Sequence, residues 1–314
     1  METKMLDFSK IKTYPIKDRK NKTSVKDFSK VCGINPSFQE FIDSLPYIFA
    51  GENFRQLVAD IVHAHKNRRS VIFMMGAHVI KCGLSPLIID LMKNGILSCV
   101  ALNGAGAIHD FEIAMIGGTS EDVAHNLEDG SFGMAEETGF NINNALKSGV
   151  KKGLGAGKAL GEKICKDKYP YREMSILFAG VKYNIPVTVH IAIGTDIIHQ
   201  HPKAEGKVLG EASYIDFKTF ASCLVNLEGG VVINFGSSVM LPEVFLKAIT
   251  ITRNLGIKIN KFTAANFDMI RHYRPEVNVL SRPTAYGGKG YYFCGYHEIM
   301  IPLLVNAVNV KMGI

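Results

Sequence analysis

The sequence of 314 residues predicts an α/β fold with a mostly parallel sheet covered by helices on both faces. Two observations support this prediction. Short apolar runs rich in β-branched residues alternate with stretches whose apolar residues recur three and four positions apart. The short runs are also continuously apolar, which is typical of parallel strands buried on both faces.

The predicted strands cover residues 70–75, 96–102, 186–193, 230–235 and 261–267. Helices are predicted at 35–50, 52–66, 84–93, 108–116, 141–148, 156–166, 172–183, 216–227, 242–255 and 298–310. No boundary divides this alternation, so we expect residues 31–314 to form a single domain. Residues 1–30 precede it as a Lys-rich arm.

The positive charge is concentrated in that arm. The first 30 residues carry a net +5 of the whole chain's +7. A nucleic-acid-binding protein normally spreads its basic excess over a folded surface, so we expect a solvated arm and no nucleic-acid partner. No apolar run approaches the roughly 20 residues of a membrane span, and no secretory signal is evident. We expect a soluble, cytoplasmic protein.

Cysteine and histidine spacing argues against a metal. The six cysteines form no Cys-x-x-Cys pair and are expected to be reduced thiols. Asp196, His199 and His201 are metal-ligating types, but their spacing is loose and no further cluster follows. We expect no metal site, and anchoring of a cationic substrate is the better use of Asp196.

Small and polar residues follow five successive predicted strands. Since the carboxyl ends of parallel strands meet at one edge, where ligands bind, this pattern predicts an extended polar ligand across that edge. The candidate ligand-binding residues are Ala77, His78, Asn103, Gly104, Gly106, Asp196, Gly236, Ser237, Ser238, Thr263, Ala264 and Asp268.

Three motifs leave alternatives open. His109 and Asp110 open a predicted helix, where they either face the ligand as general base or amine anchor or cap the helix. The segment 153–157 holds three glycines but follows a helix, which favours a junction of small residues over a dinucleotide fingerprint. Lys289 lies in a glycine-rich loop, either solvated or as a nucleophile in a desolvated pocket.

Several segments together resemble deoxyhypusine synthase. They are Ser-Ile-Leu-Phe-Ala-Gly-Val-Lys-Tyr-Asn-Ile-Pro-Val at 175–187 with Gly-Thr-Asp-Ile-Ile-His-Gln-His at 194–201, the glycine-rich 229–238, Phe-Thr-Ala-Ala-Asn-Phe-Asp at 262–268, and 281–289 with Ile-Pro-Leu-Leu-Val at 301–305. The resemblance runs from about residue 70 to the end of the chain.

This resemblance implies a Rossmann-like fold that binds NAD, and a homotetramer with sites between subunits. It implies a transferase that oxidises a polyamine and passes its aminobutyl group through an imine to a lysine. By position, Lys289 would be the Schiff-base lysine and Asp196 an amine anchor, while His109 and Asp110 occupy the place of paired acidic residues. The NAD site would include Gly104, Gly106, Ser237, Thr263, Ala264 and Asp268.

The residues expected to contact the substrate differ from those of that family. The segment 240–243, Met-Leu-Pro-Glu, replaces its histidine-containing stretch, and the chain has no tryptophan to stand beside Lys289. The stretch 109–112, His-Asp-Phe-Glu, also resembles the NAD-binding part of archaeal-type ornithine cyclodeaminases. The leading hypothesis is aminobutyl or related transfer from an amine. The alternatives are an NAD-dependent deaminase and a non-catalytic NAD-binding protein.

Overall fold

The computed structural model describes residues 4–314 and contains a six-stranded sheet in the order β3-β2-β1-β4-β5-β6, in which all neighbours are parallel. The strands are β1 (Val71–Met75), β2 (Cys99–Asn103), β3 (Val187–His190), β4 (Val231–Phe235), β5 (Thr263–Asp268) and β6 (Lys289–Cys294). Strands β1 to β3 follow one another toward one edge of the sheet, and β4 to β6 toward the other edge, so the strand order reverses between β1 and β4. This is the strand order of the Rossmann fold, so the predicted α/β class and Rossmann-like arrangement are confirmed.

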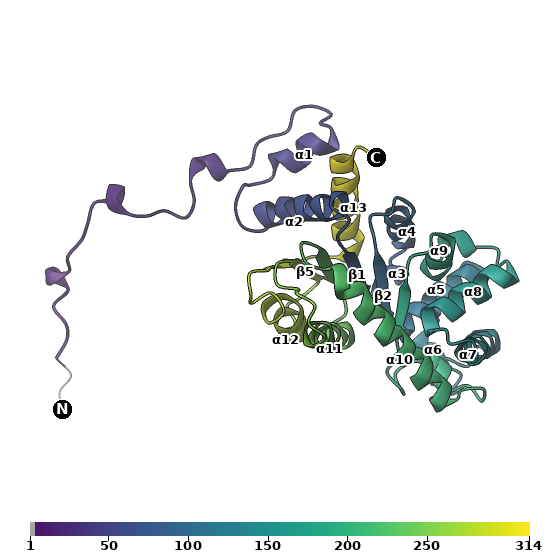
Figure 1. Cartoon of the computed structure of the whole chain (residues 1–314). Helices are drawn as coiled ribbons and strands as arrows, with labels where there is room; N and C mark the ends of the chain where they lie inside the picture. The colour runs from purple at the N-terminus through teal and green to yellow at the C-terminus, as the bar shows by residue number, and fades with distance from the viewer. Residues whose placement is uncertain (1–3) are drawn as a thin grey trace.

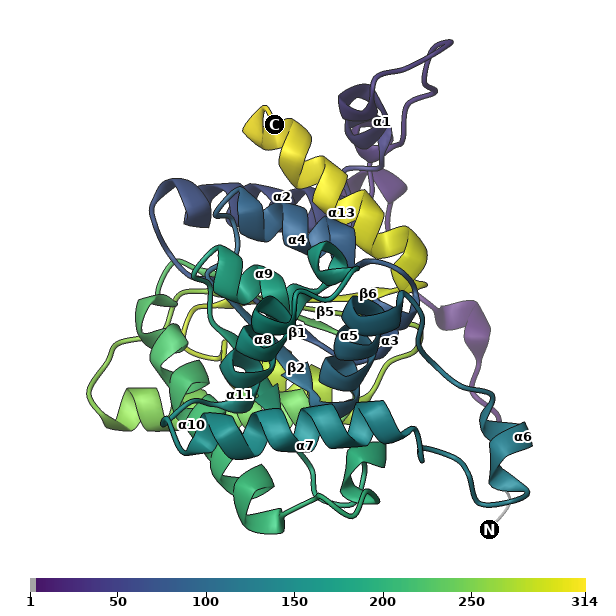
Figure 2. The ribbon, with the colours of Figure 1, turned by 90° about the vertical axis from the view of Figure 1, so that its right-hand side faces the viewer.

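Helices cover both faces of the sheet (Figures 1 and 2). One face packs against α2 (Phe49–Lys66), α4 (Ser85–Lys93), α5 (Gly104–Ile116), α8 (Ala156–Asp167), α9 (Ile176–Lys182) and α13 (His297–Met312). The other packs against α10 (Gly206–Cys223), α11 (Met240–Asn254) and the π-helical turn Glu276–Ser281. Alternate residues of β1 explain the two layers, because Phe73 faces the first core and Met74 the second, and both are fully buried.

The glycine-rich segment 153–157 joins two helices, as predicted. The helix α7 (Glu136–Val150) precedes it and α8 follows. A Cβ on Gly157 would lie 1.8 Å from the Val187 carbonyl oxygen, so only glycine lets α8 start this close to β3. The buried Asp216 carboxylate accepts hydrogen bonds from the N–H groups of Gly157 and Val189, both at 2.8 Å.

Two parts of the architecture differ from the prediction. The sixth strand, β6, begins inside the expected glycine-rich loop, and it went unpredicted because it is a half-exposed outer strand. The predicted strand 261–267 corresponds to β5, so Thr263 and Ala264, expected among the residues that follow a strand, lie inside it. Further short helices are α1 (Phe38–Ser44), α3 (His78–Lys81), α6 (Val123–Leu127) and α12 (Tyr273–Pro275).

The N-terminal arm extends away from the body of the molecule (Figure 1). It contains three 3-10 turns, Phe8–Lys10, Ile16–Asp18 and Val25–Asp27, none with a buried residue. Large apolar side chains such as Phe8 and Ile16 are exposed between its lysines. Within the described part of the chain, no helix is both long and apolar enough to cross a membrane.

Candidate functional site at the carboxyl edge of the sheet

A cavity of about 560 Å³ opens beside the carboxyl ends of β2 and β3. It lies between α5, the loop that follows α5 and the loop that follows β3. Carboxylates of Glu112, Glu121 and Asp196 line it, together with Lys81 and His109. Its remaining walls are largely aliphatic or aromatic, including Ile108, Ile116, Val123, Phe132 and Ile197.

Asp196 is the most deeply placed acid of this cavity, being 6% exposed. Its Oδ2 has no hydrogen-bond partner, and its Oδ1 is 3.5 Å from the Thr195 hydroxyl. Burial raises the pKa of Asp196 to about 6, although the Thr195 hydroxyl and the Ala105 N–H favour the charged form. A buried carboxylate with a free oxygen is suited to hold a cationic ligand.

His199 lies beside this carboxylate. Its Nδ1 accepts hydrogen bonds from the N–H groups of Gly194 and Asp196, at 3.1 and 3.3 Å. In the neutral ring the proton is therefore on Nε2, which is buried, has no partner and lies 3.9 Å from Asp196 Oδ2. Burial lowers the pKa of His199, which favours this neutral form. A donor and an acceptor that both lack hydrogen-bond partners thus lie close together.

The first turn of α5 positions the neighbouring groups. Asn103 is the N-cap, and its side-chain oxygen accepts from the Gly106 N–H at 2.9 Å. Gly104 and Gly106 are therefore helical rather than part of a turn. His109 and Glu112 lie one turn further along the same helix face, and the His109 side chain is 19% exposed at the cavity.

A second polar cluster lies at the carboxyl ends of β4, β5 and β6. Asp268 ends β5, and His297 opens α13 directly after β6. Both are buried, and neither Asp268 Oδ2 nor His297 Nδ1 has a hydrogen-bond partner. The exposed His78, after β1, lies with its ring centre 6.2 Å from that of His297. Burial lowers the pKa of His297.

The predicted glycine and serine residues have local structural roles at this cluster. Gly236 has φ +64°, and a Cβ there would lie 2.4 Å from His297 Nε2. The loops after β1 and β4 touch, because a Cβ on Gly76 would be 2.7 Å from the Gly236 carbonyl oxygen. The Ser237 hydroxyl accepts from the Leu241 N–H at 3.1 Å, in the first turn of α11. Ser238 and Ala77 lie in the same two loops, partly buried.

Asp110, which the sequence offered as a catalytic residue, does not line the cavity. Its carboxylate is fully buried and faces α9, where it accepts hydrogen bonds from the Ser175 hydroxyl (2.5 Å) and the N–H groups of Ile176 (2.8 Å) and Leu177 (3.0 Å). Burial raises the pKa of Asp110 to about 6 against the effect of these bonds. Because its oxygens are engaged by the start of another helix, we assign Asp110 a structural rather than a catalytic role.

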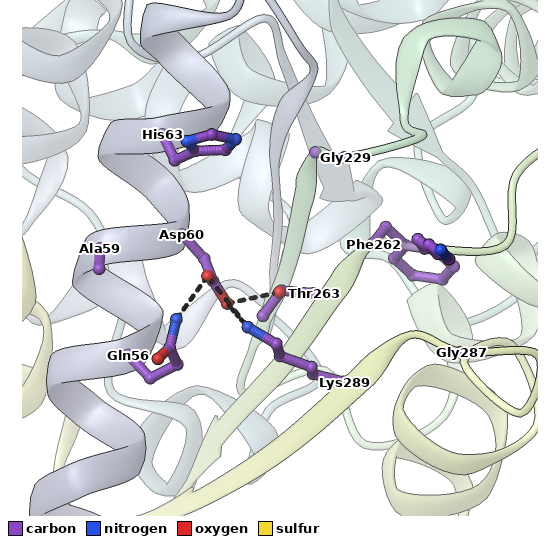
Figure 3. A pocket seen from close by; sticks show the side chains of 11 residues that line it. Gln56, Ala59, Asp60, His63, Gly229, Phe262, Thr263, Gly287 and Lys289 are labelled. Carbon is purple, nitrogen blue, oxygen red and sulfur yellow. Dashed lines mark hydrogen bonds and ion pairs between the residues drawn. The ribbon is translucent and has the colours of Figure 1, made fainter.

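Lys289, Thr263 and Ala264 do not lie with the other candidates. Lys289 and Thr263 are the first residues of β6 and β5 and pair with each other at the amino edge of the sheet. Ala264 is buried in the core. Figure 3 shows the surroundings of Lys289, a cavity of about 600 Å³ where its ammonium lies 3.3 Å from both Asp60 oxygens. Asp60 also accepts from Thr263 and Gln56, each at 2.7 Å.

The structure adds residues that the sequence did not single out. Thr119 and Thr138 both donate hydrogen bonds to the Glu112 carboxylate, at 2.5 and 2.9 Å. Glu121 reaches the same cavity from the loop after α5. The signal available in the sequence was the spacing of His109 and Glu112, which places both on one helix face. Within residues 4–314, no three His, Cys, Asp or Glu side chains converge as metal ligands do.

No protein-family model and no curated protein matches this chain. Solved structures do resemble it in fold. ArgZ, an arginine dihydrolase from the ornithine–ammonia cycle in cyanobacteria, matches with 15% identity and a TM-score of 0.50 over 84% of this chain. AgrE in complex with ornithine and NAD⁺ matches with 14% identity and a TM-score of 0.53 over 83%. The chain spans only 33% of the length of each.

A protein assigned as a deoxyhypusine synthase from Entamoeba histolytica also matches, with 13% identity and a TM-score of 0.50. Here the likeness covers 87% of this chain and 93% of the other. At such identities these likenesses establish the fold alone. The chain is thus a Rossmann-like α/β protein. Four of its side chains with a buried polar atom that lacks a hydrogen-bond partner, Asp196, His199, Asp268 and His297, end or follow strands at the edge where such folds bind ligands.

Proposed function

We propose that this protein is an NAD-dependent enzyme that oxidises the amine-bearing carbon of a small aliphatic amine. The observation that carries the proposal is the cavity beside β2 and β3, where three carboxylates stand among aliphatic walls. An aliphatic amine matches both features, because its ammonium pairs with a carboxylate and its methylene chain packs against apolar side chains.

Polar groups at the carboxyl edge support a dinucleotide as the cofactor. Asp268 and His297 each present a buried polar atom without a hydrogen-bond partner, next to the loops after β1 and β4 where the strand order reverses. Dinucleotides bind across that point in Rossmann folds. Asp268, His297, His78 and the loop of Gly236 would hold NAD, which supplies a hydride acceptor when bound. The likeness to AgrE, solved with ornithine and NAD⁺, supports this assignment.

The position of Lys289 bears on the choice of reaction. The sequence favoured aminobutyl transfer through a lysine imine, with deamination as the alternative. Lys289 lies at the amino edge, whereas Asp196 follows β3 at the carboxyl edge, so one chain does not bring them together. We therefore favour amine oxidation without a lysine intermediate, as in an ornithine-deaminating enzyme.

A second candidate is transfer through Lys289 supplied by another copy of the chain. Lys289 lies in a cavity of its own, which leaves it reachable from outside. We propose a homo-oligomer on the ground that large apolar side chains of the arm, such as Phe8 and Ile11, are exposed. The tetramer and the cytoplasmic location remain predictions.

Thermal melting with and without NAD tests the cofactor, followed by NADH absorbance on adding ornithine, putrescine or spermidine. A bound cofactor raises the melting temperature by mass action. NADH formation with an amine would support the proposal, and the active amine would define the substrate class. A shift without NADH from any amine would favour a non-catalytic NAD-binding protein. No shift at saturating NAD would contradict the proposal.

A further inference from the structure

We propose that His109 accepts a proton from the substrate ammonium group through Nε2, and that Thr119 and Glu112 hold the imidazole in the tautomer that allows this. The inference rests on the proposed function, since it deepens the role of the cavity beside α5. Thr119 and Glu112 are positioning residues, and His109 is the catalytic residue.

A chain of hydrogen bonds determines the tautomer. The Thr119 Oγ1 lies 2.5 Å from Glu112 Oε2 and 2.6 Å from His109 Nδ1. A carboxylate only accepts, so the Thr119 hydroxyl donates its single proton to Glu112. Its oxygen can then only accept from His109, which requires the proton on Nδ1. The Nε2 of the neutral ring is left with a lone pair.

Thr119 is a necessary link in this chain. The direct separation of His109 Nδ1 and Glu112 Oε2 is 3.9 Å, too long for a hydrogen bond. The second Glu112 oxygen is fixed by the Thr138 hydroxyl at 2.9 Å, from α7. Gly117, with φ +73°, ends α5 and reverses the chain so that Thr119 returns to the face of His109.

The charges around His109 suit a base. Its other charged neighbours in the cavity are Lys81, Glu121 and Asp196. Burial, with a smaller effect of the Lys81 ammonium, lowers the pKa of His109, so its ring is neutral at pH 7. The cavity therefore holds negative carboxylates for the cation and a neutral imidazole for its proton.

The step is a simple proton transfer. A carbon that bears an ammonium group does not release a hydride, because the protonated nitrogen has no lone pair to form the carbon–nitrogen double bond. The N–H bond of the substrate breaks, its electron pair becomes the nitrogen lone pair, and the proton binds Nε2 to give an imidazolium. Glu112, reached through Thr119, stabilises that cation.

The test reads the tautomer directly. Imidazole ¹⁵N NMR of the full chain, without NAD or amine, should show His109 as the Nδ1–H form, with the signal assigned by its loss in His109→Gln. Thr119→Val should shift the ring toward the Nε2–H form, and Thr119→Ser should keep Nδ1–H. An Nε2–H ring in the wild type, or no change in Thr119→Val, would overturn the inference.

Kinetics give a second readout. Thr119→Val should lower the kcat of amine-dependent NADH formation on the order of tenfold with KM unchanged, whereas Thr119→Ser should keep the kcat of the wild type. His109→Gln should lower kcat on the order of 10²-fold. An unchanged kcat in His109→Gln would overturn the role as base. Because the NMR readout needs no activity, a protein with the expected tautomer but no NADH formation contradicts the proposed function and not the positioning by Thr119.

Discussion

The Asp196 carboxylate occupies the space that a side chain at residue 104 would need. A Cβ placed on Gly104 would lie 1.9 Å from Asp196 Oδ2. The first residue of α5 is therefore glycine because the loop after β3 delivers an acid against the start of the helix. The positive end of the helix dipole favours an anion there, which offsets part of the cost of burying it.

Replacing Gly104 by alanine should displace this carboxylate. We expect Gly104→Ala to raise the KM for the amine, or its Kd, on the order of tenfold or more, while the protein stays folded. Titration calorimetry or NADH kinetics would measure the change. The control is Gly210→Ala on α10, where a Cβ would meet nothing within 4 Å, and which should bind as the wild type does. Equal affinity of the two variants would show that Asp196 does not anchor the amine.

Asp196→Asn should lose amine binding and raise the free energy of unfolding. The pKa of Asp196 in the folded protein is about 6, above its ordinary value of 3.8. The native state thus holds a proton that the unfolded chain releases, so this group's stability contribution is lost as pH rises from about 4 through 6. At pH 8 the variant should be more stable by about 1–3 kcal/mol in urea unfolding, with its amine affinity lost.

In the wild type, amine binding should rise as pH increases through about 6, because the ionised carboxylate is the binding form. Calorimetry between pH 5 and 8 would follow it. A flat affinity over this range would exclude Asp196 as the anchor, as would a variant Asp196→Asn that binds like the wild type.

Asp110→Ala should damage the fold more than a comparable change at the surface. It removes three hydrogen bonds at the start of α9 and leaves buried N–H groups unpaired, at a cost of roughly 2–4 kcal/mol. The matched control is Asp122→Ala, where an exposed aspartate caps α6 through the N–H groups of Ala124 and His125. It should cost at most about 1 kcal/mol. Equal unfolding free energies of the two variants would contradict the structural role of Asp110.

Lys289→Ala separates the two candidate reactions. If the amine is oxidised at the carboxyl edge of one chain, NADH formation should stay within about twofold of the wild type. Lys261→Ala, which removes another lysine from the same amino-edge cavity, serves as the control. An amine-derived imine that borohydride traps on the wild type and on Lys261→Ala but not on Lys289→Ala would instead favour transfer through the lysine of a second copy.

The strands that the sequence predicted are those buried on both faces, because such strands are continuous apolar runs. All residues of β1 and β4 are buried, for example, whereas β6 is half exposed and begins with Lys289 and Gly290. The signal for β6 was Tyr291, Tyr292 and Phe293, whose β-propensity indicates a strand that starts at the lysine. A strand that starts there places Lys289 at the amino edge.

The sequence could not show that His109 faces the cavity while Asp110 faces α9. Neighbouring residues on a helix point about 100° apart, so one faces the cavity and the other faces α9. Which residue faces which depends on where α9 packs, and that position follows from the whole chain. The i, i+3 spacing of His109 and Glu112 was visible, whereas Thr119 joins them only because the loop after α5 folds back.

Lys289 stands five residues before Cys294, which pairs with Asp268 at the other end of the sheet. At about 3.3 Å per residue this separation is roughly 16 Å, twice the Debye length of about 8 Å at physiological ionic strength. Because Lys289 is half exposed, solvent and salt weaken the effect of its ion pair with Asp60 on the acids at the carboxyl edge. A change at the Lys289 end of the sheet should therefore alter the titration of the acids at the other end only weakly.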